Sequence, residues 1–173
     1  MQLHPNVQAV QDALDAAGAR DAAGQPSRVR LLPDAVHTAV AAAAALDVQV
    51  GQIANSLVFD ADGDPLLVLT SGAHRADTGK LAAFVGATGV RRASAEFVRE
   101  HTGQPIGGVA PLGHPQRPRS GSQASPHPIR TLVDRALAGY QEIWAAGGVP
   151  RAVFPTTYDE LVRVTDATPA DGA

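Results

Sequence analysis

The segment IANSLVFDADGDPLLVLTSG, residues 53–72, carries the clearest strand signals in the sequence. Two runs of mainly aliphatic residues, IANSLVFD and PLLVLTSG, flank the sequence DGD. Such runs around a short Asp/Gly segment are typical of a β-hairpin, because Asp and Gly accept the backbone conformations that a tight turn needs. We therefore predict two adjacent strands joined by a tight turn.

Other segments have the composition of strands. They are SRVRLLP (27–33), IRTLVD (129–134), QEIWAA (141–146) and RAVFP (151–155), and IGGVAP (106–111) also returns to extended chain. The two glycines at 147 and 148 predict a turn between two of these strands. Tight turns of this kind favour an antiparallel or mixed sheet over a doubly wound parallel sheet.

Helix signals are interleaved with these strands. Val7, Val10 and Leu14 recur at helical spacing ahead of Gly18, which predicts an amphipathic helix with a C-terminal glycine. Residues of the types that cap helix N-termini precede four further helices, at Thr38, Asp77, Ser94 and Thr156 or Thr157. The irregular alternation of helices and strands predicts an α+β fold.

Length and composition indicate one domain. A chain of 173 residues can bury a sizeable core, and an aromatic content of 4% means that mainly Ala, Val and Leu fill it. The absence of cysteine excludes disulfides and thiolate catalysis and is compatible with a reducing cytoplasm, where we expect the protein. We place the domain at residues 1–168, a flexible loop insertion in the Pro/Ser/Gly-rich residues 116–128, and a frayed tail at 169–173.

Charge and histidine spacing exclude several functions. The formal net charge of −3 gives no global electrostatic reason to bind long nucleic acids. No export signal is evident, and no apolar run reaches the roughly 20 residues that cross a bilayer, so we expect no membrane partner. The six histidines are scattered singly, and we therefore expect no metal and no organic cofactor.

The segment TGQPIGGVAPLGHP, residues 102–115, has two interpretations. It holds four glycines and three prolines, and His114 is its only ionisable side chain. Glycine and proline are turn-formers, so the segment can be purely structural. Glycine also lets a ligand approach the main chain, whose N–H and C=O groups can then bind it. Composition does not decide between the two.

Five blocks of sequence occur in a specific order. They are HTAVAAAAAL, GQIANSLVF, DGDPLLVLTSG, GGVAPLGHP and WAAGGVPRAVFPTTYDELVRVT. In this order they resemble the YbaK/ProX family of aminoacyl-tRNA deacylases over nearly the whole chain. The resemblance implies an α+β fold with a mixed, mostly antiparallel, partly closed sheet flanked by helices. It also implies hydrolysis of the ester that joins a wrong, small amino acid to tRNA, with the proline tRNA as one candidate.

The resemblance also implies a site and partners. Gly107 and Gly108 would hold the ribose and the attacking water, and Asn55 stands where the family usually has a lysine. The substrate-binding residues implied by the matching blocks and their neighbours are His37, Thr38, Ile53, Ser56, Val109, Pro111, Leu112, Gly113 and His114. The partner would be the 3′ end of an aminoacyl-tRNA, with a transient association with an aminoacyl-tRNA synthetase.

Alternatives remain open at this point. Asn55 offers a neutral amide, and Val153 and Phe154 occupy a strand in which the family often has an acid, so a catalytically weak binding module of the same fold is a second hypothesis. A hydrolase of another small acyl ester is a third. Arg117 and Arg119 either contact acceptor-stem phosphates or belong to a disordered insertion. We expect Gly108→Ala to abolish activity without affecting folding.

Overall fold

The computed structural model describes residues 3–114 and 129–170, and its centre is the predicted hairpin. Strands β2 (Ile53–Ala61) and β3 (Asp64–Ser71) pair antiparallel from Ala54 opposite Ser71 to Ala61 opposite Asp64. Asp62 and Gly63 make the turn with φ of 53° and 95°, the positive values that a tight hairpin turn requires. The prediction from residues 53–72 is therefore confirmed.

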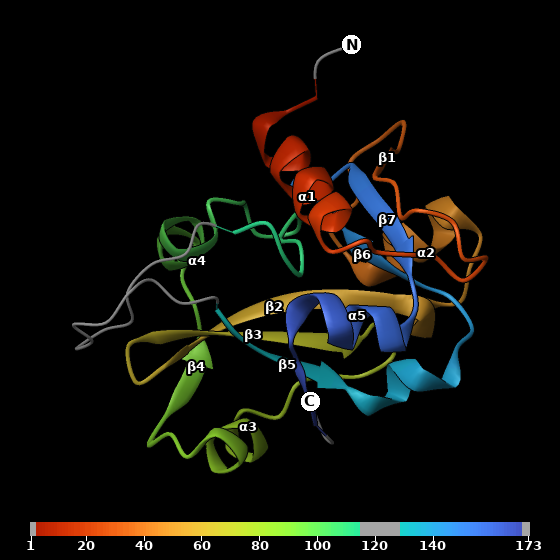
Figure 1. Ribbon diagram of the computed structural model, residues 1–173. Helices are drawn as coiled ribbons and strands as arrows, with labels where there is room; N and C mark the ends of the chain where they lie inside the picture. Colours follow the sequence, from red (N-terminus) through yellow and green to blue (C-terminus); the bar gives the residue numbers. More distant parts are fainter. Residues whose placement is uncertain (1–2, 115–128, 171–173) are drawn as a thin grey trace.

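Further strands extend this hairpin into one mixed sheet (Figure 1). The strand order is β1, β7, β6, β2, β3, β5, β8, and β4 pairs with β2 beside this path. The added strands are β1 (Arg30–Leu31), β4 (Val90–Arg92), β5 (Arg130–Asp134), β6 (Ile143–Ala146), β7 (Ala152–Thr156) and β8 (Thr168–Ala170). Pairing is parallel for β2 with β6, β3 with β5 and β5 with β8, and antiparallel elsewhere. The α+β class with a mixed sheet is confirmed, and the path of strands is open.

Five α-helices surround the sheet, together with the 3₁₀ helices η1 (Val50–Gln52) and η2 (Arg135–Gly139) in the described residues. The α-helices are α1 (Pro5–Ala16), α2 (Ala39–Leu46), α3 (Thr78–Val85), α4 (Ala95–Thr102) and α5 (Tyr158–Thr165). A side-chain oxygen caps each of the last four, because Thr38, Asp77, Ser94 and Thr157 accept a hydrogen bond from the backbone N–H three residues on. The predicted caps are confirmed.

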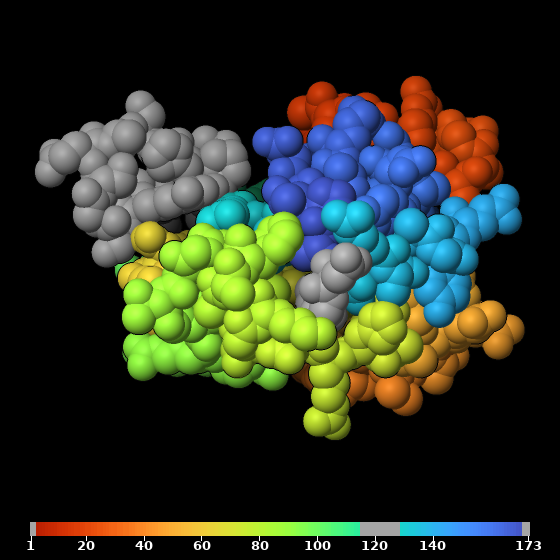
Figure 2. Space-filling model, turned by 90° about the horizontal axis from the view of Figure 1, so that it is seen from below, coloured from red at the N-terminus to blue at the C-terminus, as the bar shows by residue number. Residues whose placement is uncertain are grey.

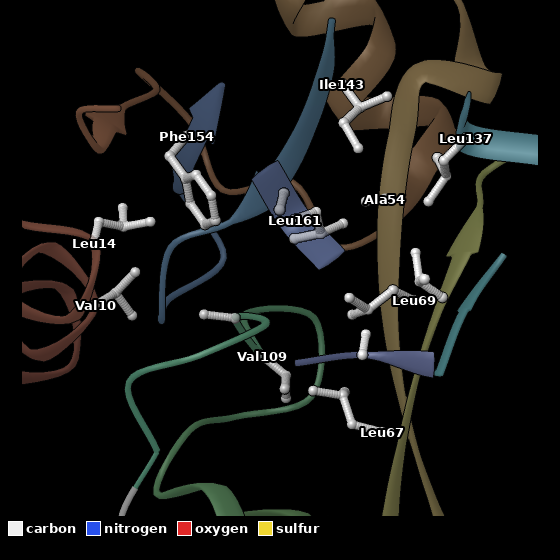
Figure 3. Close-up of a cluster of buried hydrophobic side chains, with 14 of the residues drawn as sticks. Val10, Leu14, Ala54, Leu67, Leu69, Val109, Leu137, Ile143, Phe154 and Leu161 are labelled. Carbon is white, nitrogen blue, oxygen red and sulfur yellow. The ribbon is translucent and has the colours of Figure 1, made fainter. Parts of the chain in front are cut away.

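The main core joins α1 and α5 to the inner face of the sheet (Figure 3). Val10 and Leu14 of α1 lie near Phe154 of β7 and Leu161 of α5. Val109 approaches from the loop that follows α4, so this loop is anchored in the core. On the other side, α3 covers the sheet with Leu81, and Figure 2 shows its yellow-green segment at the front of the view from below.

Three predictions about extended chain need correction. Of SRVRLLP, only Arg30 and Leu31 form strand, because only they have ladder partners on β7. IGGVAP contains a turn and irregular chain and no strand. Residues 169 and 170, predicted to be frayed, belong to β8 and pair with Val133 and Asp134. Residues 116–128 and 171–173, including the predicted loop insertion, lie outside the described residues.

Candidate functional site

A cavity of about 260 Å³ lies beside the middle of β2. Strand β2 pairs with β6 at Ile53 and Ala54 and with β4 from Phe59 to Ala61. Figure 1 shows β6 and β4 toward opposite ends of β2. In the described part of the chain, residues 55–57 between these contacts have a strand neighbour only on the β3 side. The cavity therefore occupies an open stretch of sheet edge.

The open edge presents main-chain groups. The N–H of Gly72 donates to the C=O of Ile53 at 2.8 Å, so Ile53 and every second residue after it direct their main-chain groups toward β3. The intervening residues point the other way, as the 3.4 Å bond from the Ala93 N–H to the Val58 C=O shows. The N–H and C=O of Ser56 consequently face the gap between β6 and β4.

Small apolar side chains make up much of the cavity wall. Six alanines contribute, from α2 and three strands: Ala39, Ala42, Ala54, Ala145, Ala146 and Ala152. Their methyl groups leave room for a small ligand while keeping the wall apolar.

Seven of the site residues expected from sequence line this cavity, and five do not. Those that do are His37, Thr38, Ile53, Asn55, Ser56, Gly107 and Val109. Gly108, Pro111, Leu112, Gly113 and His114 are absent from its lining. The structure therefore divides the glycine-rich segment between the two roles that the sequence left open.

Gly107 brings main chain to the cavity. Its φ is 90°, a left-handed value that favours glycine, and a Cβ built there would lie 3.2 Å from Nδ1 of His37. The imidazole of His37 therefore stands directly against the Gly107 backbone. His37 is exposed, and it is joined to α2 through its neighbour Thr38, the cap of that helix.

Gly108 faces the opposite way, into protein. A Cβ at this position would lie 2.7 Å from the Val149 backbone and 2.8 Å from the nitrogen of Pro150. Its N–H already donates to the Pro105 carbonyl at 2.9 Å. The close contact makes Gly108 a packing residue, so we now expect Gly108→Ala to impair folding, in contrast to the expectation from sequence.

The rest of the motif packs under α1 and in the core. Gly113 has φ of 84°, and a Cβ there would lie 3.0 Å from the Val10 Cα. Pro111 is buried, and Leu112 packs against the main core. His114 donates from Nε2 to the Ala110 carbonyl at 2.6 Å, and burial lowers its pKa from 6.5 to about 4. It is a neutral structural residue near pH 7.

Two buried polar residues brace this loop and were not identified from sequence. Gln104 is 2% exposed, and its side-chain oxygen accepts from the Ala110 N–H at 2.8 Å. Thr102 donates from Oγ1 to the Val98 carbonyl at 2.7 Å, and the same oxygen accepts from the Gln104 N–H at 3.0 Å. These bonds hold both ends of the Gly107 turn, which preorganises its main chain. Sequence offers little signal for them, because Thr and Gln are commonly exposed.

Asn55 and Ser56 lie on opposite faces of β2, so the cavity wraps around the strand edge. The Ser56 hydroxyl and the Trp144 indole N–H are buried and have no hydrogen-bond partner in the structure as described. Buried polar groups are usually paired, which makes these two unusual. The sequence did not predict Trp144 as a site residue, because QEIWAA has the composition of a core strand. In the structure, the Arg30 guanidinium lies 4.9 Å from the centroid of the Trp144 ring.

Arg92 and Ile106 also line the cavity, and neither was predicted. Ile106 is 56% exposed, and its position directly before Gly107 was the available signal. No group of three or more potential metal ligands occurs among residues 3–114 and 129–170. Within the same residues, no helix has the length and apolarity needed to cross a membrane.

Comparison with known families identifies the class of protein. The family model of the aminoacyl-tRNA editing domain matches residues 33–164, which include every element that lines the cavity. The chain therefore belongs to the aminoacyl-tRNA editing domain family.

Individual relatives agree with this assignment. The chain is 41% identical to a proposed trans-editing enzyme for prolyl-tRNA synthetase of known crystal structure, with a TM-score of 0.82 and 98% of each chain covered. A scaffold protein used for epitope grafting is 37% identical, with a TM-score of 0.81 and coverage of 98% of this chain and 97% of the scaffold.

Proline–tRNA ligases of Maridesulfovibrio salexigens and Nitratidesulfovibrio vulgaris are each 34% identical over 77 residues. These matches cover 44% of this chain and 13% of each ligase, so the chain corresponds to a small part of those enzymes.

Proposed function

We propose that this protein hydrolyses, in trans, the ester between a small amino acid and the 3′-terminal ribose of tRNA, with the proline tRNA as its leading substrate. The observation that carries the proposal is the Gly107 main chain, which lines the same alanine-walled cavity as the open strand edge at Ser56. Membership in the editing-domain family and the similarity to a proposed trans-editing enzyme support it.

The cavity suits a small acyl group. Its volume is about 260 Å³, and the alanine methyl groups of its wall leave room for a small apolar side chain beside the ester. Main-chain groups of Ser56 and Gly107 can bind the polar parts of such a substrate, namely its ribose hydroxyls, amino group and ester carbonyl. Alanine, serine and cysteine are side chains of suitable size.

The reaction needs a positioned water. Its oxygen attacks the ester carbonyl carbon, the bond from that carbon to the ribose oxygen breaks, and the proton lost by the water ends on the released ribose hydroxyl. In this proposal Gly107 holds the water, and the Asn55 amide donates to the oxygen on which negative charge develops. Among the described lining residues, only His37 has a side chain that can act as a general base, and it lies against Gly107.

The test is single-turnover release of labelled amino acid from alanyl-, cysteinyl- and seryl-tRNA carrying the proline acceptor, compared with buffer alone. Rapid release from at least one substrate is the expected result, and it names the amino acid. Binding without release from any substrate would contradict the enzyme proposal. It would support the binding module, which the neutral Asn55 amide favours.

Asn55→Lys separates a weakened enzyme from an adapted one. A lysine would add a positive charge beside the oxyanion. If the site lacks only this charge, the substitution should sharply accelerate release of the amino acid. A neutral or harmful effect on an already active wild type would show that asparagine suits the native substrate.

We further propose only a transient association with an aminoacyl-tRNA synthetase, which co-sedimentation with prolyl-tRNA synthetase would detect.

A further inference from the structure

Arg92 shares a face of the sheet with Asn55. It lies at the end of β4 directly opposite Phe59 of β2, and directly opposed residues of an antiparallel pair project to the same face. Phe59, Leu57 and Asn55 alternate along β2 and therefore share that face. Arg92 is exposed and reaches the cavity wall from this position.

The neighbouring arginine is already neutralised. Arg91 projects to the opposite face, where its guanidinium meets the Asp60 carboxylate at 3.3 Å. The Arg92 guanidinium makes no ion pair or hydrogen bond with any described residue. Arg91 and Arg92 therefore point to opposite faces of the sheet, and only Arg91 is paired with a carboxylate. Arg91 is thus a matched control for Arg92.

The cavity gives Arg92 no anionic partner. Among the described residues of the lining there is no carboxylate, and Arg92 carries the only permanent charge. This is a local contrast with the formal net charge of −3 for the whole chain. An anion at the cavity mouth would therefore meet an uncompensated guanidinium, whose fork of N–H donors matches phosphate oxygens.

We propose that Arg92 binds the phosphodiester on the 5′ side of the terminal nucleotide of the acylated tRNA and thereby positions the ester at Gly107. This inference rests on the proposed function. The ester is on the terminal ribose, and the nearest negative charge of the substrate is the phosphate of that nucleotide. Arg92 is a positioning residue here, because it contacts the substrate away from the reacting atoms.

The test compares two substrates that differ in phosphate. Wild type, Arg92→Gln, Arg92→Lys and Arg91→Gln are assayed on the fastest aminoacyl-tRNA of the panel and on the same amino acid esterified to adenosine, which has no phosphate. Arg92→Gln should lower kcat/KM for the tRNA about tenfold, the effect of one charge-assisted contact, and leave the adenosine ester unchanged. Arg92→Lys should restore part of the loss.

Salt dependence gives a second readout. Losing one phosphate contact should reduce the slope of log KM against log salt by about 0.7 for the single-stranded tRNA end. Arg91→Gln should retain the wild-type slope and both rates. Equal losses on the two substrates, or no loss on the tRNA, would overturn the proposal.

If the wild type hydrolyses neither substrate, the proposed function is wrong, and binding alone then tests the role of Arg92. Dissociation constants are then measured for amide-linked, non-hydrolysable analogues: alanyl-adenosine, and the trinucleotide CCA with the same alanyl end. Arg92→Gln should weaken only the trinucleotide, about tenfold. An unchanged trinucleotide affinity would overturn the assignment of Arg92.

Discussion

Gly107 and Gly108 are adjacent and identical in type, yet they belong to two different regions of the molecule. Gly107 faces the cavity, where the nearest atom to an added Cβ is in an exposed histidine side chain. Gly108 faces the main chain at Val149 and Pro150, which is part of the turn between β6 and β7. One short motif thus places a cavity-facing backbone and a packing contact side by side.

The difference arises from what surrounds each residue. A side chain such as His37 can move aside, whereas backbone held between two paired strands cannot without breaking the pairing. Gly108 is enclosed by the β6–β7 turn and Gly113 by α1, and Leu112 packs against the core. Three substitutions test this division, in order of their expected effect on stability.

Gly108→Ala should destabilise the protein by roughly 3 kcal/mol, because its Cβ overpacks against backbone 2.7 Å away. Urea unfolding measures this loss. Gly139→Ala is the matched control, since nothing lies within 4 Å of its Cβ, and its effect should stay within about 0.5 kcal/mol. If the two variants are equally stable, the interpretation of Gly108 as a packing residue is wrong.

His114→Gln should flatten the dependence of stability on pH. The folded pKa of His114 is about 4 against 6.5 for an ordinary histidine, so the unfolded chain binds more protons between these values. The contribution of His114 to the free energy of unfolding of the wild type is therefore highest above pH 6.5. It falls by on the order of 3 kcal/mol as the pH decreases from 6.5 to 4, because the unfolded chain gains a proton there.

Glutamine keeps an N–H donor for the Ala110 carbonyl but does not titrate. The measurement is urea unfolding of both proteins at several pH values between 4 and 7. A stability gap between them that stays constant over this range would contradict the burial of a neutral His114.

Gly107→Ala should lower stability by only about 1–2 kcal/mol, the cost of a left-handed alanine, and should abolish most hydrolysis. Gly24→Ala isolates the backbone cost, since Gly24 has φ of 79° and open space around its Cβ. Melting curves and single-turnover release are measured for both. If the two variants lose equal activity, Gly107 has no special place at the site.

Much of the fold was predictable because its signals are local. The Asp62–Gly63 turn and the aliphatic runs on either side of it specify the hairpin. Thr38, Asp77, Ser94 and Thr157 cap helices through bonds to residues three positions away. Strand β8 was missed because its stability comes from β5, which lies far away in sequence and was not visible as a partner.

The candidate site was predictable only in part. Asn55 and Gly107 were identified through family resemblance, and both line the cavity. Trp144 and Arg92 were not, because an indole in a strand and an arginine beside another arginine have ordinary structural explanations. Their position at the cavity depends on the register of β6 and β4 against β2.

Residue types alone predict the alternation of helices and strands, the central hairpin and the helix caps, because these signals are local. Which glycine faces the cavity, which arginine is paired with a carboxylate and where the edge of β2 is open depend on the folded chain. These features depend on contacts between segments far apart in sequence, and such contacts leave no mark on the residue types alone.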